Sequence, residues 1–286
     1  NVTVTDPATV AELTAIDAAN TNGTLSYTSV SDTAANLAAS AGAYVAAGKN
    51  VTVTGAATVA ELTDIDAANT NGALSYSGIT DDANNLVNAS GLGLSGYVTG
   101  SVAVTLNTTA TRAQLAAIDQ ATTGTLSYTS MSDTAATLAA NLGGYVSGAV
   151  NVTVTDAATL AQLTTINGLS TGTLSYTSVS DTAANLAANA EGYVTGEVNV
   201  TVTDAATLAQ LTDIDVANTT GTLSYTSVSD TAANLAANAG GYVTGEVNVT
   251  VTDAATLDQL AIIAGLTTGT LSYTSVSDTA ANLFNN

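Results

Sequence analysis

The chain has 286 residues, with 23 acidic and only two basic side chains, so its formal net charge is −21. Nucleic acids and anionic membrane surfaces are recognised through basic patches, and this balance therefore excludes both as expected partners. The sequence contains no cysteine, so neither disulfides nor thiolate metal sites are expected. No apolar run approaches the roughly 18 residues of a membrane span, so membrane insertion is not expected either.

The surface must owe its polarity to Thr, Ser and Asn, because only 9% of the residues are charged while 46% are hydrophobic. Typical intracellular domains carry about a quarter charged residues. An ion-poor, Thr-rich composition is more typical of secreted, matrix-like proteins. We therefore expect an extracellular protein at a cell surface.

An internal repeat dominates the sequence. The tripeptide Leu-Ser-Tyr occurs six times, starting at Leu25, Leu74, Leu126, Leu174, Leu223 and Leu271. A fixed period of this length is the signature of a repeat architecture. It predicts one array of six repeats with approximate bounds 1–49, 50–101, 102–149, 150–197, 198–246 and 247–286, the last one truncated. The second repeat is longer than the others, which predicts a surface loop inserted at 91–96.

The first half of each repeat begins with a strand and continues as a helix. In residues 198–203, Val alternates with Asn or Thr, and this alternation predicts a half-buried strand. Leu208, Leu211 and Ile214 then recur every three residues, as on one face of a helix. Asp204 stands between the two and is predicted to be the N-cap. In the first repeat Pro7 follows Asp6 directly, and Pro favours the first helical position.

Glycine follows each first-half helix and is predicted to stop it in a left-handed conformation. The glycines concerned are Gly23, Gly72, Gly124, Gly172, Gly221 and Gly269.

The second half of each repeat contains a short strand that ends at another aspartate, followed by a short Ala-rich helix, as in residues 222–241. If the aspartates of the two halves are aligned, Leu25 and Tyr27 fall on the strand face opposite to Val2 and Val4. Either a bulge re-aims these side chains inward or the outer face carries a Leu/Tyr ladder. The sequence leaves both alternatives open.

Strand and helix alternate throughout at about 24 residues per βα unit, which predicts parallel strands joined by right-handed crossovers. A parallel sheet with helices on both faces has continuous apolar strands, whereas these strands are apolar at every second position. One sheet face should therefore be solvated. The predicted fold class is α/β, a repeat solenoid with a parallel sheet on one side and helices on the other.

Two motifs, Val-x-Val-Thr-Asp and Ser-Asp-Thr-Ala-Ala-Asn-Leu, resemble repeats of very large secreted bacterial cell-surface proteins of the marine cyanobacterial type. These proteins are described as haemolysin-type, calcium-binding or S-layer-like. The resemblance extends over all six repeats and implies secretion and a cell-surface role. It brings no calcium site, because the glycine-rich motif Gly-Gly-x-Gly-x-Asp is absent here.

The predicted helix caps invite two interpretations. In the first halves the caps are Asp6, Gly55, Thr108, Asp156, Asp204 and Asp253, and in the second halves Asp32, Asp81, Asp133, Asp181, Asp230 and Asp278. Aspartate accepts helix N–H bonds and favours the positive end of the helix dipole. The alternative is a ladder of carboxylates that coordinates Ca²⁺. Gly55 and Thr108 interrupt such a ladder, and this favours capping, so no metal ligand is assigned.

Pairs of threonines two residues apart, such as Thr201 and Thr203, should be exposed on the sheet. Rows of threonine at strand spacing occur on ice-binding solenoids, but the intervening strands here offer Ser29 and Ser31 instead. The simpler interpretation is β-favouring polar residues on a solvated face.

The sequence contains no His, Cys or Trp, and each serine lies in a repeated context without a base, so we expect no enzyme and assign no catalytic or cofactor-binding residue. The expected function is that of a structural segment of a larger secreted protein: a spacer, filament or surface-layer component. The alternative is an adhesive or ligand-binding module, either a calcium-stiffened adhesin or an ice or glycan binder. Because the array lacks polar end repeats, we expect it to be part of a longer one and to associate end to end with neighbouring repeats or other copies.

Overall fold

The computed structural model describes residues 1–40, 42–87 and 93–284, which form two compact units. The first unit contains residues 1–132, 143–145 and 149–151, and the second contains 133–142, 146–148 and the chain from Val152 onward. No helix within the described ranges is long and apolar enough to cross a membrane.

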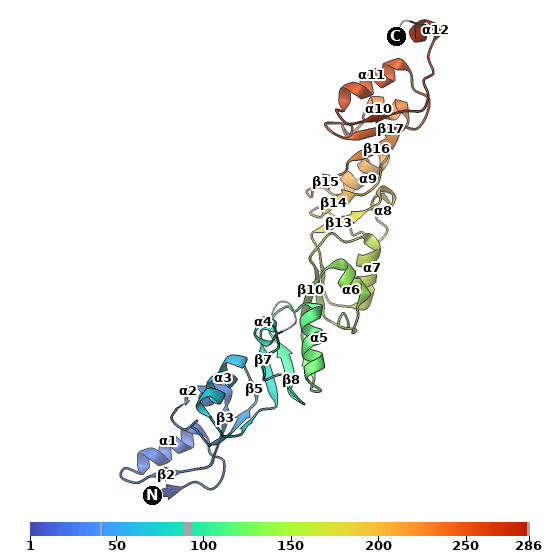
Figure 1. The fold of residues 1–286 in the computed structure, drawn as a ribbon. Coiled ribbons are helices and arrows are strands. Elements are labelled where there is room, and N and C mark those ends of the chain that lie inside the picture. Colours follow the sequence, from blue (N-terminus) through green and yellow to red (C-terminus); the bar gives the residue numbers. More distant parts are fainter. Residues whose placement is uncertain (41, 88–92, 285–286) are drawn as a thin grey trace. The chain divides into compact units, whose positions relative to one another are not determined.

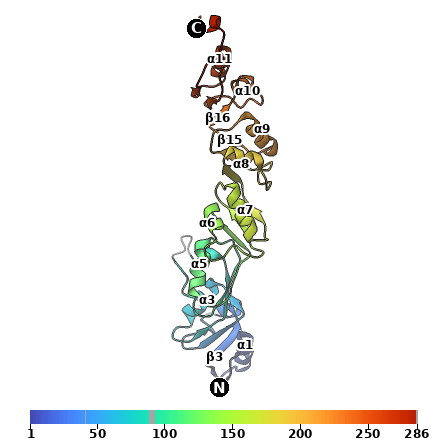
Figure 2. The same cartoon turned by 90° about the vertical axis from the view of Figure 1, so that its right-hand side faces the viewer.

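Strands and helices alternate along both units (Figures 1 and 2). The first unit contains β1 (Val2–Thr3), α1 (Val10–Ala19), β2 (Leu25–Ser26), β3 (Ser29–Thr33), α2 (Ala34–Ala39), β4 (Asn50–Thr54), β5 (Ala56–Ala57), α3 (Val59–Ala68), β6 (Leu74–Ser75), β7 (Gly78–Asp81), α4 (Ala83–Leu86), β8 (Ala103–Leu106), α5 (Arg112–Ala121) and β9 (Leu126–Ser127).

The chain passes from the first unit to the second in β10 (Ser130–Asp133). There follow α6 (Ala135–Ala140), β11 (Asn151–Val154), α7 (Leu160–Leu169), β12 (Leu174–Ser175), β13 (Ser178–Asp181), α8 (Ala183–Ala188), β14 (Asn199–Val202), α9 (Leu208–Ala217), β15 (Leu223–Ser224), β16 (Ser227–Asp230), α10 (Ala232–Ala237), β17 (Asn248–Val251), α11 (Leu257–Leu266), β18 (Leu271–Ser272) and α12 (Ala280–Phe284).

The Val-rich strands are half-buried, as their alternation predicts. In β14, Val200 and Val202 are buried while Asn199 and Thr201 are exposed. The strand pairs in parallel with β13 on one side and β15 on the other, so that Val200 lies opposite Val179 and Leu223. The same arrangement recurs at β17. The predicted fold class is confirmed: repeated βα units and parallel sheets recur with the period of the sequence, and one sheet face is solvated.

The first-half helices begin later than the sequence predicted. Each begins four residues after the predicted cap (Asp6, Gly55, Thr108, Asp156, Asp204 and Asp253), so Pro7 lies before the helix rather than at its start. The N-caps are Thr9, Thr58, Thr111, Thr159, Thr207 and Thr256. Each threonine forms a capping box with a Glu or Gln three residues on, which satisfies two backbone donors that would otherwise be unpaired. The predicted apolar helix face is confirmed, since Leu208, Leu211 and Ile214 are all buried.

The second-half strand is interrupted after its first two residues. In the first repeat the chain bends at Thr28, between β2 and β3. Leu25 and Tyr27 are half-buried, whereas beyond the bend Val30 and Asp32 are the buried positions. The bend inverts the alternation, and it resolves the orientation that the sequence left open: a local break re-aims the side chains, and Leu25 and Tyr27 do not form an exposed ladder.

The short helices also begin later than predicted, two residues after Asp32, Asp81, Asp133, Asp181, Asp230 and Asp278. Their N-cap is a threonine in α2, α6, α8 and α10, and Asp82 in α4. Three of these helices end at a left-handed asparagine, namely Asn141, Asn189 and Asn238. The Asn238 side chain donates to the carbonyl of Val243 and accepts from its N–H, which fixes the following turn.

The glycines after the long helices do not adopt the predicted left-handed conformation. Glycine is required at most of these positions because the backbone there passes very close to a carbonyl of the segment just before the Val-rich strand. A Cβ on Gly221 would collide with the carbonyl oxygen of Val198, and the same contact recurs between Gly124 and Val102. The loop predicted at 91–96 lies partly outside the described residues, and within them Leu94 forms an antiparallel bridge with Val87.

Candidate functional surface

The sequence predicted no catalytic, cofactor-binding or metal-binding residue. Among residues 1–40, 42–87 and 93–284, no group of three or more His, Cys, Asp or Glu side chains is placed to hold a metal ion. The features that recur in several repeats are aspartate bridges, tyrosine pairs and an exposed polar sheet face.

The first-half aspartates bind the helix that precedes them in the chain. The Asp204 Oδ1 atom accepts a hydrogen bond of 2.7 Å from the backbone N–H of Ala183, the first residue of α8. Asp253 binds Ala232 of α10 and Asp156 binds Ala135 of α6 at the same distance. In the third repeat the Thr108 hydroxyl replaces the carboxylate and accepts from Ala83. Each of these side chains therefore connects its own βα unit to the one before it.

Five of the six second-half aspartates make the same three bonds, namely Asp32, Asp81, Asp181, Asp230 and Asp278. The Asp230 Oδ2 atom accepts from the N–H of Leu208, the first residue of α9, at 3.0 Å. The Oδ1 atom accepts from the N–H of Thr231 and from the Asn234 amide, both at 2.8 Å. Equivalent bonds to the preceding long helix are made by Asp32, Asp81, Asp181 and Asp278.

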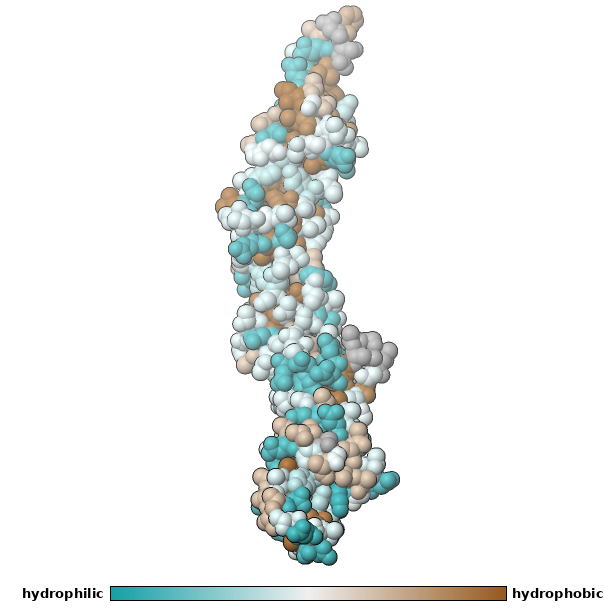
Figure 3. Space-filling model, turned by 90° about the vertical axis from the view of Figure 1, so that its left-hand side faces the viewer, coloured by the Kyte–Doolittle hydropathy of each residue, from teal (hydrophilic) through white to brown (hydrophobic). Residues whose placement is uncertain are grey.

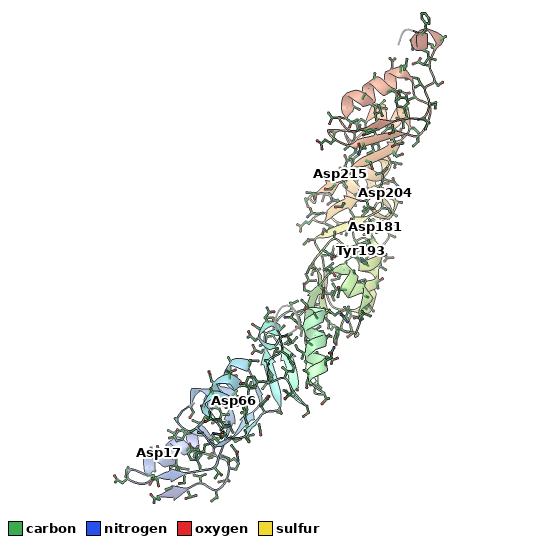
Figure 4. All side chains as sticks on the ribbon, in the orientation of Figure 1. Asp17, Asp66, Asp181, Tyr193, Asp204 and Asp215 are labelled. Atoms are coloured by element: carbon green, nitrogen blue, oxygen red, sulfur yellow. The ribbon has the colours of Figure 1, made fainter. Side chains whose placement is uncertain are left out.

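The sequence thus predicted the type of bond and assigned it to the wrong helix. Asp181 and Asp204, both labelled in Figure 4, lie in the second unit at the ends of strands, and each binds the first N–H of a helix more than 20 residues earlier in the chain. A carboxylate at that position interacts favourably with the positive end of the helix dipole. The carboxylate oxygens are directed at N–H donors, and this favours the capping interpretation over a calcium ladder.

The pKa values of three of these aspartates respond to their hydrogen bonds. Burial alone would raise the pKa of Asp230, but the bonds from Asn234, Thr231 and Leu208 together lower it below the usual value. The pKa of Asp32 is lowered in the same way. At Asp278, the backbone bonds from Leu257 and Thr279 lower the pKa. Folding therefore favours the charged form of these aspartates. The stability that they contribute to the folded protein is lost as the pH falls below about 4.

We expect Asp230→Ala to lower the free energy of unfolding by about 2–3 kcal/mol, because three donors lose a charged acceptor: the first N–H of α9, the N–H of the α10 N-cap Thr231 and the Asn234 amide. Asp213→Ala is the matched control: it removes the same charge from an exposed position of α9 and should change stability by less than about 0.5 kcal/mol. Urea unfolding followed by circular dichroism measures both variants. Equal effects would show that Asp230 contributes through net charge alone.

Within a repeat, a pair of tyrosines links the second-half strand to the turn that follows the short helix. The Tyr225 hydroxyl donates to the carbonyl of Tyr242 at 2.9 Å, and the two rings meet edge to face with centroids 6.4 Å apart. The Tyr176 and Tyr193 pair has the same geometry, with a centroid distance of 6.2 Å. Burial raises the pKa of Tyr176 and Tyr225. Such aromatic pairs contribute about 0.5–1.5 kcal/mol beyond the area that they bury.

The exposed sheet face carries rows of hydroxyl groups. Thr201 lies between Ser180 and Ser224 in register, and Thr250 lies between Ser229 and Ser272. Threonine therefore alternates with serine from strand to strand, so these rows contain no unbroken run of methyl groups. Much of the molecular surface visible in Figure 3 is of intermediate hydropathy, as expected for a chain rich in Thr, Ser, Gly and Ala.

Sequence reasoning missed the capping threonines, although the signal was present. Thr207 is followed three residues later by Gln210, and Thr9 by Glu12, which is the capping-box spacing. The aspartate placed just before each helix was the more conspicuous candidate.

Comparison of the chain with protein-family models, with curated proteins and with solved structures gives no match. The resemblance to repeats of bacterial surface proteins therefore stays a prediction.

Proposed function

We propose that this chain is an extracellular structural segment of a larger secreted protein, acting as a spacer, filament or surface-layer component rather than as an enzyme. The observation that carries the proposal is the bonding between successive βα units. Asp204 and Asp253 each bind the helix of the preceding βα unit at 2.7 Å, and Asp230 binds the first N–H of α9 in the βα unit before its own at 3.0 Å. The aspartates that recur along the chain thus bind one βα unit to the next.

The alternative is a binding module that uses the exposed hydroxyl rows. A regular threonine surface would favour ice or glycan binding, whereas tyrosines packed between neighbouring repeats favour assembly. The rows alternate between Thr201 and serines, so they do not form a regular threonine surface, and this favours the structural role. The ion-poor composition supports an extracellular location.

The same bonding indicates how a second copy of the chain would be recognised. Val2 in β1 is 36% exposed, whereas its equivalents Val51 and Val249 are 1% exposed because another strand covers them. At the other end Tyr273 is 50% exposed, in contrast to the half-buried Tyr225. By analogy with β16 and β17, residues 1–4 of one copy would pair with 275–278 of another. Such head-to-tail contacts are heterologous and propagate as open fibres.

We expect this association to require salt. The charge of −21 repels a second copy at low ionic strength. At about 1 M NaCl the Debye length is only about 3 Å, so the repulsion is largely screened while burial of Val2 still contributes. Analytical ultracentrifugation at low and high NaCl should show a monomer and a concentration-dependent series of oligomers, respectively.

A matched pair of variants tests the register. In the second unit the Thr252 N–H donates to the carbonyl of Asp230 at 3.0 Å, and Thr5 is the equivalent donor for a second copy. Thr5→Pro removes this N–H and should abolish oligomers at high salt, whereas Thr5→Ala keeps it and should not. A wild-type monomer at every salt and protein concentration would contradict self-association and leave a passive spacer.

A further inference from the structure

Two hollows of the second unit occupy equivalent positions, one repeat apart. The first, of about 350 Å³, is lined by Tyr176, Thr177, Glu197 and Val198 among others. The second, of about 420 Å³, is lined by Tyr225, Thr226, Glu246, Val247 and Asn248. Each hollow therefore combines a tyrosine with the carboxylate of an exposed glutamate.

The first repeat shows what fits against this tyrosine. Lys49 stands at the position that Val198 and Val247 occupy in the later repeats, directly before the Asn of the Val-rich strand. Its Nζ atom donates to the Tyr27 carbonyl at 2.8 Å and lies 4.4 Å from the centre of the Tyr27 ring. An ammonium group is thus bound by a backbone oxygen and an aromatic face together.

At two later repeat junctions a valine stands in place of the lysine, and a glutamate precedes that valine. Val198 and Val247 are too short to place a cation over the tyrosine, and Glu197 and Glu246 lie beside them where the first repeat has Gly48. The second unit contains no Lys or Arg of its own, because the only two basic residues are Lys49 and Arg112. The glutamate supplies a negative charge that can attract a free cation. In the first repeat the cation is Lys49 itself, which the chain already holds in place.

We propose that the hollows at Tyr176 and Tyr225 bind primary ammonium groups of the kind that a lysine side chain presents. The ammonium would donate to the tyrosine carbonyl as Lys49 does, lie over the ring, and pair with Glu197 or Glu246. Equivalent points two strands apart are separated by roughly 10 Å at the usual strand spacing. A ligand with two ammonium groups at that separation can therefore engage both hollows and gain from multivalency. This site is independent of end-to-end assembly.

Butylammonium, which reproduces the lysine side chain, is the first probe, with butanol as its neutral counterpart. At low salt we expect saturable NMR shifts of the Tyr176 and Tyr225 rings, assigned with Tyr→Phe variants, and none with butanol. Glu197→Gln with Glu246→Gln should weaken binding about three- to tenfold, since each carboxylate is exposed and its charge is partly screened. Heptanediamine should bind more tightly than butylammonium.

Val247→Lys supplies the decisive control, because it gives the second hollow its own lysine in the place of Lys49. This variant should lose the response of Tyr225 and keep that of Tyr176. Lys49→Val exposes Tyr27 without adding a carboxylate and should create only a weaker site. Shifts that persist unchanged in Val247→Lys and in the glutamate variants, or that butanol reproduces, would overturn the proposal.

Discussion

Replacing Gly221 with valine is expected to lower the free energy of unfolding by more than about 3 kcal/mol. A Cβ at this position would meet the carbonyl oxygen of Val198, which lies at the start of the same βα unit, and the Asn218 side chain. Backbone cannot move aside as a flexible side chain can, and the Gly221 N–H already bonds to the Gly196 carbonyl at 2.7 Å. Overpacking that forces backbone shifts costs roughly 1–3 kcal/mol, and the loss of a buried hydrogen bond adds to it.

Gly168→Ala provides the control for this prediction. Gly168 lies inside α7, and a Cβ there would meet nothing within 4 Å. Alanine is favoured over glycine in a helix by up to about 1 kcal/mol, so this variant should be slightly stabilised. Denaturant unfolding with an unchanged m-value measures both. If Gly221→Val unfolded with the midpoint of the wild type, the close approach of Gly221 to the Val198 carbonyl would be wrong.

Gly221 also shows what a single sequence can and cannot reveal. Its recurrence once per repeat led to the prediction of a left-handed conformation, which is wrong, because two physical causes produce the same pattern. A left-handed conformation requires glycine because of its own backbone, whereas a close approach requires it because of an atom of another segment. The second cause depends on Val198, which is brought next to Gly221 only by the folding of the chain.

The aspartates show the same limit of sequence-based prediction: the type of bond was predicted, but the partner was not. The alternation of Val and Thr and the three-residue spacing of Leu208, Leu211 and Ile214 are local patterns, and the elements that they predicted are present. A carboxylate at a strand end predicts capping, but Asp204 caps α8, whose first residue is 21 positions earlier. Local sequence favoured the nearest helix. The bend at Thr28 was unpredictable for a related reason: it lets one segment, from β2 to β3, pair with two different strands.

Deletion of residues 198–246 is expected to leave a folded protein. The deletion joins Glu197 to Val247, which restores the local sequence Gly-Glu-Val-Asn-Val-Thr of both junctions. The new neighbours repeat contacts that already exist: α8 would pack on α11 as it now packs on α9, and Asp253 would bind Ala183 as Asp204 does. In a stack of repeats, stability is a sum of repeat and interface terms, so one repeat with its two βα units and one interface between repeats are lost, and the others stay.

The repeat period leads to a more specific prediction. Deletion of a whole repeat should leave a folded protein, whereas deletion of half a repeat should not. Deletion of residues 198–222 joins Glu197 to Leu223 and leaves α8 beside α10, two short helices that end at left-handed asparagines. Asp230 would then lose Leu208, the first residue of the long helix that it binds. We expect this protein to lose cooperative unfolding, whereas the deletion of 198–246 keeps a single sharp transition with an m-value reduced in proportion to the surface removed. Circular dichroism during urea unfolding distinguishes the two. Two equally folded products would mean that successive βα units are interchangeable, and a globally unfolded product of the whole-repeat deletion would mean that the second unit is one interlocked domain.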